Sequence, residues 1–373
     1  MKIAMVLPPW LKVPPEGYGG IEIIVSLLTD GLVSRGHEVT LCTVASSSTK
    51  ARIFNVFDDE MKSYLDGPPS SFMNIALTHT LASYIELAKG DYDIIHDHTW
   101  QEGLSCAAFI DTPIIHTLHG PLDEESIKFY SLFKDYPGIH FVTISNYQQT
   151  CLPGLNYAAT VYNGVDLPRY PYSEEKEDFF FYLGRFNGAK APHLACEVAE
   201  KLGKRLILAG AILNQAERSY FDQYIKPHLS NDISYVGELG HWSEEKMRLL
   251  SRARGYLYPI QWHEPFGITI VEAMACGTPV VIFKRGAGPE VIAHGITGFV
   301  VETMEEFIDA AKHIDEISPR ACRERAENIF SARRMVDNYE RVYIKILGRE
   351  QRQMELGGLI DVSKAIIQRY TPN

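Results

Sequence analysis

Short apolar runs alternate with amphipathic segments along most of the chain. Helical periodicity is found at Ile21–Ser34, Leu194–Leu202 and Glu244–Arg254. The apolar runs predict strands at Lys2–Leu7, Glu38–Val44, Ile94–Asp97, Ile114–Leu118, Phe141–Ile144, Phe179–Leu183, Arg205–Ala209, Ile233–Val236, Gly255–Tyr258 and Val280–Phe283. Near-continuous apolar strands separated by helices are typical of parallel sheets covered on both faces. The pattern therefore predicts an α/β fold.

Turn-forming residues interrupt this pattern near the middle of the chain. Asn163–Asp166 is a turn signal, and Pro168, Pro171 and the charged run Glu174–Asp178 follow it. We therefore predict two doubly wound, Rossmann-like domains that face a central cleft, over residues 1–168 and 169–347. The tail, residues 348–373, has no assigned function. In such sheets ligands bind beyond the carboxyl ends of the strands.

The composition removes several classes of function. The 373 residues include 36 basic and 47 acidic side chains, a net charge of −11. This balance argues against a nucleic-acid partner and against a strong anchor on an anionic membrane. No apolar run approaches the ~18 residues of a membrane span. The six cysteines are scattered without a C-x-x-C pair, which predicts free thiols in a reducing, cytoplasmic compartment.

A glycine cluster opens the first predicted helix. Gly17, Gly19 and Gly20 precede Ile21, and glycines at a helix N-terminus let an anion approach the backbone amides. The cluster is not G-x-G-x-x-G, and the second strand does not end in an acidic residue, so a nicotinamide dehydrogenase is disfavoured. A plain flexible turn is the alternative interpretation.

The strongest signal is a pair of glutamates eight positions apart, Glu264 and Glu272. Gly267 predicts a helix that begins there or at Ile268, so the amides of Ile268 and Thr269 would face a diphosphate in the cleft. The two carboxylates would then accept hydrogen bonds from different sugar hydroxyls. The alternative is an acidic cap plus an exposed helix glutamate, but the apolar neighbours of Glu272 disfavour an unpartnered carboxylate.

This segment resembles the E-x7-E motif of the retaining nucleotide-sugar glycosyltransferases of family 4, which have the two-domain GT-B fold. The resemblance continues at Gly184–Lys190, where the family uses an arginine and a lysine five positions later to hold the donor diphosphate. Arg185 and Lys190 fit that spacing, although Ala191 stands where the family usually has glycine. The sequence at Pro259–Trp262 is similar to that of bacterial members of the avilamycin-type subgroup.

The same resemblance assigns further residues. His119, at a predicted strand end, matches the family's histidine near the donor sugar and the reaction centre, whereas His116 lies within the strand and is predicted to be a core residue. The family places backbone contacts to the nucleobase near Val236 and Gly237, which leaves the base unidentified. Ala332–Leu347 resembles the helix with which the family's second domain crosses back to the first.

Two acidic or histidine-rich stretches look like metal motifs and are interpreted otherwise. Asp91–Asp93 is formally D-x-D, but it precedes a strand and so lies at the wrong edge of the sheet. In His96–Asp97–His98, neighbouring side chains of a strand point to opposite faces and cannot all converge on one ion. We therefore expect no metal and no bound cofactor.

The resemblance implies a retaining glycosyltransferase that works by metal-independent front-face displacement. The acceptor-side domain would be residues 1–168, and residues 169–347 would bind the nucleotide-sugar donor; the acceptor would be a small molecule or a glycan. Three alternatives stay open: an epimerase on the same fold, a phosphorylase carrying pyridoxal phosphate, and a non-catalytic nucleotide-sugar-binding protein. The donor base and sugar, the acceptor, the pathway and the oligomeric state cannot be read from the sequence.

Overall fold

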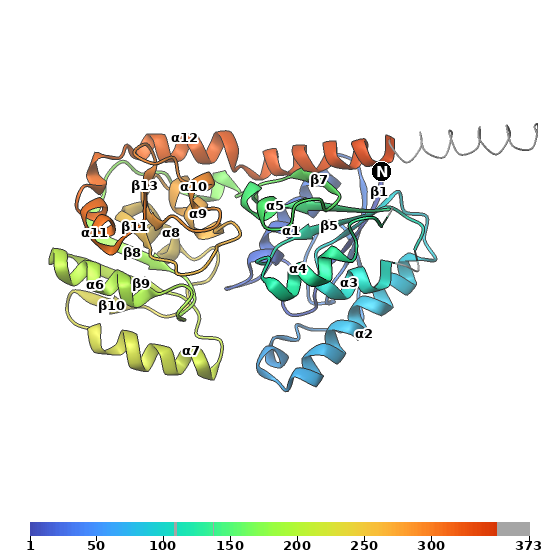
Figure 1. Ribbon diagram of the computed structural model, residues 1–373, viewed down its shortest axis with the longest axis horizontal. Coiled ribbons are helices and arrows are strands. Elements are labelled where there is room, and N and C mark those ends of the chain that lie inside the picture. The colour runs from blue at the N-terminus through green and yellow to red at the C-terminus, as the bar shows by residue number, and fades with distance from the viewer. Residues whose placement is uncertain (108–109, 137, 349–373) are drawn as a thin grey trace, which may run out of the picture.

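The computed structural model describes residues 1–107, 110–136 and 138–348, which form two lobes side by side (Figure 1). Each lobe contains one parallel β-sheet with helices packed on it. The first sheet has seven strands in the order β3-β2-β1-β4-β5-β6-β7, and the second has six in the order β10-β9-β8-β11-β12-β13. The predicted pair of doubly wound, Rossmann-like units is confirmed.

The strands run over β1 Lys2–Val6, β2 Glu38–Cys42, β3 Arg52–Phe54, β4 Ile94–Asp97, β5 Ile114–Leu118, β6 Ile139–Thr143, β7 Tyr157–Thr160, β8 Glu177–Leu183, β9 Arg205–Ala209, β10 Ile233–Tyr235, β11 Ala253–Tyr258, β12 Val280–Phe283 and β13 Gly298–Val301. The α-helices run over α1 Gly20–Ser34, α2 Pro69–Leu87, α3 Gln101–Cys106, α4 Glu124–Ser131, α5 Asn146–Cys151, α6 Pro192–Leu202, α7 Gln215–Tyr220, α8 Glu244–Arg252, α9 Ile268–Ala275, α10 Gly288–Val291, α11 Met304–Lys312 and α12 Pro319–Ile329. Residues 332–348 form one more helix, here called the closing helix.

Strand β1 shows why the sequences of the central strands are near-continuous apolar runs. Ile3 and Met5 pack in one core cluster with α1 and the closing helix, while Ala4 and Val6 pack in another with α2, α3 and α4. Both faces of the sheet are therefore buried, which favours apolar residues at successive positions of a central strand.

The strands that the sequence did not predict lie at the sheet edges. β3 and β7 are the two edges of the first sheet, and β13 is one edge of the second. Edge strands have fewer buried neighbours, so their side chains carry a weaker apolar signal. The predicted Phe141–Ile144 strand begins two residues earlier, at Ile139.

Two helices correct the expectations. The helix predicted to run through Arg254 ends at Arg252, because β11 begins at Ala253. Helix α2 was not predicted, and its apolar and polar side chains are not segregated as in an ordinary surface helix. Its solvent-exposed apolar side chains, spaced four residues apart, are Met73, Leu77, Leu81 and Ile85. Its buried polar side chains are His79, Thr80 and Ser83.

The chain crosses between the lobes at two segments that pair with each other. The amide of Val165 donates to the carbonyl of Phe330 at 2.8 Å, and the amide of Ala332 donates back to Val165 at 2.9 Å. A side chain on Gly164 would collide with the backbone of Ala332, so this close approach needs glycine. The closing helix leaves this crossing and runs along the first lobe (Figure 1), as the resemblance implied.

The closing helix belongs to the core of the first lobe, although it follows the second lobe in sequence. Tyr339 and Tyr343 are fully buried there, in the cluster that also contains β1 and α1. At its surface, Arg35 forms ion pairs with Asp337 and Glu340. The first lobe is thus complete only when residues from the end of the described chain are in place.

Two further findings bear on the composition. All six cysteines are free thiols, as predicted. Within the described ranges, no helix combines the length and apolarity that a bilayer span requires.

The position of Tyr339 gives a stability prediction. Tyr339→Ala should lower the free energy of unfolding by about 3–5 kcal/mol, because it leaves a large cavity between the closing helix and the first sheet. Ile344→Ala on the same helix is the matched control, since Ile344 is 59 % exposed, and it should change the free energy by less than about 0.5 kcal/mol. Thermal melts monitored by circular dichroism check both. Equal melting of Tyr339→Ala and the unsubstituted protein would contradict this packing.

Candidate functional site

The residues predicted to form a site lie at the carboxyl ends of their strands, as expected. Arg185 follows β8, Val236 and Gly237 follow β10, and Glu264 follows β11. In the first lobe, His119 directly follows β5, and Gly19 and Gly20 lie in the connection from β1 to α1. Because the strands of each sheet are parallel, these positions lie together at the carboxyl ends of its strands.

Glu264 lies at the centre of a hydrogen-bonded cluster. Its Oε2 accepts from Tyr258 Oη at 2.8 Å and from Trp262 Nε1 at 3.1 Å, and it forms a close ion pair with Lys190 Nζ. Lys190 also donates to the Tyr258 hydroxyl at 2.8 Å and lies over the Trp262 ring. Glu264 is buried, so the lysine supplies the charge that such a carboxylate requires. The sequence placed Lys190 and Glu264 in one site, and the structure brings them into contact.

Arg185 is held by a carboxylate that the sequence analysis missed. Its Nε donates to Glu217 Oε1 at 2.6 Å, and its guanidinium lies 5.9 Å from the centre of the Tyr18 ring on the other lobe. Glu217 is itself fixed, because its Oε2 accepts from the amide of Leu213 at 2.8 Å and its Oε1 accepts from Asn187. The arginine is therefore oriented before any ligand arrives.

Helix α9 begins where the glycine predicted. Gly267 is its N-cap, with φ of 87°, a left-handed conformation that favours glycine. Ile268 and Thr269 are the first two helical residues, so their amides have no intrahelical acceptor. The resulting positive end of the helix lies three residues along the chain from Glu264.

Glu272 is more deeply enclosed than the sequence indicated, with 1 % of its surface exposed. Its Oε1 accepts from Tyr170 Oη at 2.8 Å and from Lys246 Nζ at 3.0 Å, and His241 Nε2 lies 3.8 Å away. Burial alone would raise the pKa of Glu272, but the charge of Lys246 and these hydrogen bonds bring that pKa below its ordinary value. Among the described residues, none hydrogen-bonds to its buried Oε2.

In the first lobe, His119 contacts His98: Nδ1 of His98 and Nε2 of His119 are 2.9 Å apart. Burial and, to a smaller extent, the neighbouring His116 lower the pKa of His119 to about 3. The ring of His119 lines a small recess with Trp100 and Gly120. His116 itself is a buried core residue packed against aromatic rings, as predicted.

The glycine junction reaches across to the second lobe. Gly19 is the N-cap of α1 and Gly20 its first residue, with open space where a Gly20 side chain would lie. Just before them, the amide of Tyr18 donates to Glu238 Oε1 at 3.0 Å. Glu238 follows Gly237, whose φ of 85° turns the chain after β10. This places the predicted nucleobase loop beside the glycine junction.

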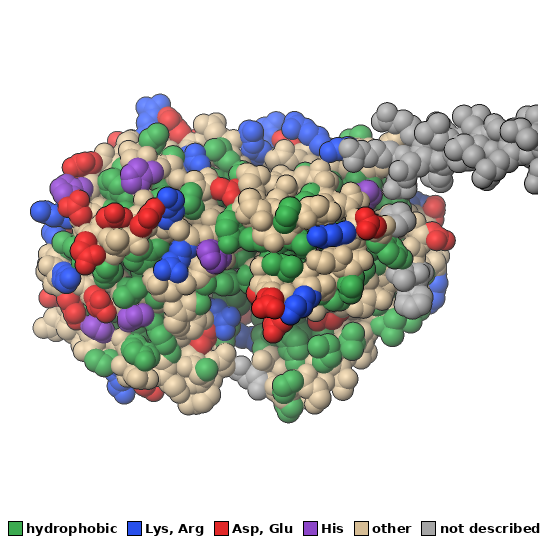
Figure 2. Space-filling view, viewed as in Figure 1, with side chains coloured by type: hydrophobic (Ala, Val, Ile, Leu, Met, Phe, Trp, Pro, Cys, Tyr) green, Lys and Arg blue, Asp and Glu red, His purple; other side chains and the backbone are tan. Residues whose placement is uncertain are grey.

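A second contact between the lobes is made by Glu290 on α10. Its carboxylate accepts from the amides of Asn146 and Tyr147, at 2.8 and 2.6 Å, at the start of α5. It also accepts from the Tyr162 hydroxyl at 3.0 Å. Nearby, the rings of Tyr147 and His263 stack 5.4 Å apart. Figure 2 shows the lobes in contact, with a notch between them at the lower edge of this view.

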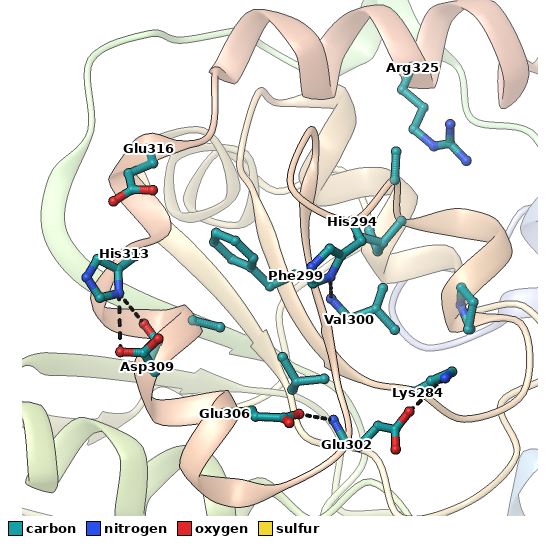
Figure 3. Close-up of a pocket in the computed structure, with 15 residues that line it drawn as sticks. Lys284, His294, Phe299, Val300, Glu302, Glu306, Asp309, His313, Glu316 and Arg325 are labelled. Atoms are coloured by element: carbon teal, nitrogen blue, oxygen red, sulfur yellow. Dashed lines mark hydrogen bonds and ion pairs between the residues drawn. The ribbon is translucent and has the colours of Figure 1, made fainter.

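A large surface depression lies elsewhere. It measures about 990 Å³ and is lined by residues of α10, β13 and α11 (Figure 3). None of the predicted site residues lines it. Several of its polar groups already bond to one another: His294 accepts from the amide of Val300, Lys284 pairs with Glu302, and His313 pairs with Asp309.

The two stretches that mimic metal motifs lie as expected. Asp91 forms an exposed ion pair with Lys2 at the amino end of the first sheet, away from the cleft. Asp97 accepts from Tyr84 Oη, whereas His96 on the other face of β4 bonds Tyr343 and Thr117. Within the described ranges, no group of three or more His, Cys, Asp or Glu side chains has metal-binding geometry.

Two family models match the chain. One, described as Glycosyltransferase Family 4, matches residues 18–169, and the other, described as Glycosyl transferases group 1, matches residues 169–331.

Similar proteins and structures cover most of the chain. Glycogen synthase of Mycobacterium tuberculosis is 26 % identical over 80 % of this chain and 81 % of its own length. Spore coat protein SA of Bacillus subtilis is 25 % identical over 92 % of this chain and all of its own length. The crystal structure of AviGT4, a glycosyltransferase of avilamycin A biosynthesis, superposes with a TM-score of 0.70 and 25 % identity over 93 % of this chain and 98 % of that one. HepE of Anabaena, in complex with UDP and glucose, shares the fold (TM-score 0.66, 18 % identity, covering 95 % of this chain and 99 % of that one).

The buried ion pair of Lys246 and Glu272 gives a prediction with a pH dependence. Lys246→Met should destabilise the protein by about 3–5 kcal/mol near pH 7, because it leaves a buried carboxylate without its countercharge. Lys128→Met, at a lysine whose side chain is 72 % exposed, is the control and should change stability little. Adding Glu272→Gln to Lys246→Met should recover part of the lost free energy of unfolding, because it removes the unpaired carboxylate.

The sign of the pH effect follows from the lowered pKa of Glu272. In the unsubstituted protein, the stability from this lowered pKa is present above the ordinary glutamate pKa and is lost as pH falls through the folded value. In Lys246→Met, protonation of the buried Glu272 carboxylate instead stabilises the folded state. The difference in the free energy of unfolding between the two proteins should therefore shrink as pH falls from 7 toward about 4, the ordinary glutamate range. Chemical denaturation at several pH values measures it, and a difference independent of pH would contradict the assignment.

Proposed function

The chain belongs to the glycosyltransferases of family 4 and group 1, and we propose that it moves a sugar from a nucleoside-diphosphate sugar to an acceptor hydroxyl with retention of anomeric configuration. The observation that carries the proposal is the pairing of two cations with buried carboxylates beside a helix N-terminus. Arg185 with Glu217, and Lys190 with Glu264, stand at neighbouring strand ends next to the free amides of α9. A diphosphate is the anion that such a group of donors fits.

In the proposed complex, the diphosphate replaces a carboxylate as a partner of Lys190. Its oxygens accept from Arg185, from Lys190 and from the amides of Ile268 and Thr269. Glu264, relieved of part of its ion pair, then accepts from a hydroxyl of the donor sugar. Its bonds from Tyr258 and Trp262 keep it in place during the exchange. The ion pair of the free protein thus becomes two separate contacts to the donor.

The rest of the donor would extend along the second lobe. Glu272 is proposed to accept from the ribose hydroxyls through Oε2, the oxygen that makes no hydrogen bond to a described residue. The backbone of Val236 and Gly237 would contact the base, and the turn at Gly237 supports this because it leaves no side chain in the way. Residues 169–331 would accordingly form the donor domain, because the closing helix packs in the first lobe.

The acceptor would enter from residues 1–168, past Gly19, Gly20 and His119. Its hydroxyl oxygen attacks the anomeric carbon on the face that the diphosphate leaves. The bond from the anomeric carbon to the phosphate oxygen breaks, and that oxygen takes the proton of the acceptor hydroxyl. No side chain acts as a covalent nucleophile and no metal ion is required in this scheme. Catalysis rests on orientation and on stabilising the departing charge.

Contacts between the lobes would exclude water from this reaction. Glu290 bonds two amides of α5, and Glu238 bonds the amide of Tyr18, so both ends of the donor region are tied to the first lobe. A closed site limits transfer of the sugar to water. We place the protein in the reducing cytoplasm, which its six free cysteines support.

A donor panel tests the proposed function. Thermal shifts are measured with the diphosphates of uridine, guanosine, adenosine and thymidine, and with their sugars. The nucleotide that binds the native state should raise the melting temperature by mass action. Transfer from that donor to an acceptor panel is then followed by NMR of the product anomer. Retention supports the proposal. Inversion would contradict the proposed stereochemistry. Turnover of the donor without any acceptor would indicate an epimerase, a pyridoxal phosphate absorbance would indicate a phosphorylase, and donor binding without turnover would indicate a non-catalytic protein.

The two cations give the mutational prediction. Arg185→Ala and Lys190→Ala should each lower kcat by about 10²–10³-fold, because the charge they meet grows as the diphosphate departs. Lys204→Ala is the matched control. Lys204 pairs with Asp178 at the amino ends of the strands of the same sheet, so this substitution should leave kcat unchanged. Steady-state rates with saturating donor measure this, and near-normal turnover in both cation variants would refute the assignment.

A further inference from the structure

A continuous series of contacts runs from the closing helix to His119. The hydroxyl of Tyr343 lies 2.7 Å from His96 Nδ1, and the rings of His96 and His98 lie 3.8 Å apart, centre to centre. His98 Nδ1 lies 2.9 Å from His119 Nε2. On its other side, His96 Nε2 lies 2.7 Å from the hydroxyl of Thr117. His119 therefore has a neighbour that is itself held between the sheet and the closing helix.

The three imidazoles are neutral. Burial, and after it the neighbouring histidines, hold the pKa of His96 and of His98 well below the ordinary histidine value. The pKa of His119 is about 3 for the same reasons. A neutral imidazole carries one N–H donor and one acceptor nitrogen. The contact between His98 and His119 therefore contains a single proton, which belongs to one ring or the other.

The far nitrogen of His98 decides between the two arrangements. His98 Nε2 is buried, and no described residue hydrogen-bonds to it. If His119 donated to His98, the proton of His98 would lie on this Nε2 as a buried N–H without an acceptor. Such groups are rare in native proteins because they lose their hydrogen bond to water without replacement. In the opposite arrangement His98 Nε2 carries only a lone pair.

We propose that His98 is a positioning residue that donates from Nδ1 to His119 Nε2 and so fixes the proton of His119 on Nδ1. His119 then acts as a hydrogen-bond donor at the carboxyl end of β5. It is suited to an oxygen of the substrate, either a sugar hydroxyl or a phosphate oxygen, and not to a donor group. The use of this donor in catalysis rests on the proposed function, but the tautomer is a property of the free protein.

The ring of His96, which packs against that of His98, explains why His98 keeps this orientation. His96 is bonded on both nitrogens, by Tyr343 of the closing helix and by Thr117 of β5. Thr117 in turn lies 3.2 Å from the Tyr339 hydroxyl, so two residues of the closing helix support the same ring. The closing helix thereby contributes to the geometry of His119 as well as to the core of the first lobe.

The tautomer is measured directly by long-range ¹H–¹⁵N NMR of the free protein labelled with ¹⁵N-histidine. His119→Gln identifies the signals of His119. We expect a protonated Nδ1 and an unprotonated Nε2 in the unsubstituted protein. A His119 protonated on Nε2 would overturn the proposal. Because the measurement needs no donor, absence of glycosyl transfer would count against the proposed function and not against this inference.

Two substitutions of His98 separate its donor from its packing. His98→Phe keeps the ring and removes the donor, so His119 should become a mixture of tautomers and kcat should fall by about 10–100-fold, the range for residues that orient a functional histidine. The KM for the donor should change little. His98→Asn keeps an N–H close to Nδ1 and should restore the tautomer and most of kcat. A His119 spectrum unchanged in His98→Phe would contradict the proposal. If that variant does not fold, the spectra of the unsubstituted protein and of His98→Asn still decide.

Discussion

The candidate site depends on one constraint: the charges of its partly buried cations must be neutralised when no ligand is bound. Under the proposed function, a protein with net charge −11 must concentrate cations in one place to bind a diphosphate, and those cations must be partly buried to act strongly. Buried charges without partners are costly, so each cation is matched with a carboxylate. Lys190 is matched with Glu264, and Arg185 with Glu217. The carboxylates therefore hold the ligand-binding geometry in the free protein.

The same requirement explains features outside the immediate site. Glu272 is ionised inside the second lobe because Lys246 and Tyr170 surround one of its oxygens. His119 has no carboxylate partner at hydrogen-bond distance among the described residues, and burial keeps it neutral. The second lobe thus contains paired charges, and the first presents a neutral histidine. Under the proposed function, this division suits one lobe to a charged donor and the other to an uncharged acceptor hydroxyl.

Sequence reasoning found the positions that local rules control. Strand ends and the start of α9 follow from short-range patterns and from the rule that ligands bind at the carboxyl ends of parallel strands, whereas Arg185 and Lys190 were assigned through the resemblance to the family. It missed the partners Glu217 and Lys246, because each pairs with a residue more than twenty positions away and only the tertiary fold brings them together. Helix α2 was missed because its exposed face is apolar at Leu77 and Leu81 while its buried face contains His79, so the helix lacks the usual segregation of apolar and polar positions. The contact between the rings of His96 and His98 was not predicted from the sequence.

A crystal structure of the chain with the nucleoside diphosphate selected by the donor panel tests the proposed site most directly. We predict that the diphosphate oxygens lie within hydrogen-bond distance of the Arg185 guanidinium, Lys190 Nζ and the first amides of α9. The contact between Lys190 and Glu264 should be broken or lengthened, since the phosphate takes its place. A diphosphate bound away from α9, or one that leaves the Lys190–Glu264 pair as it is in the free protein, would contradict the account.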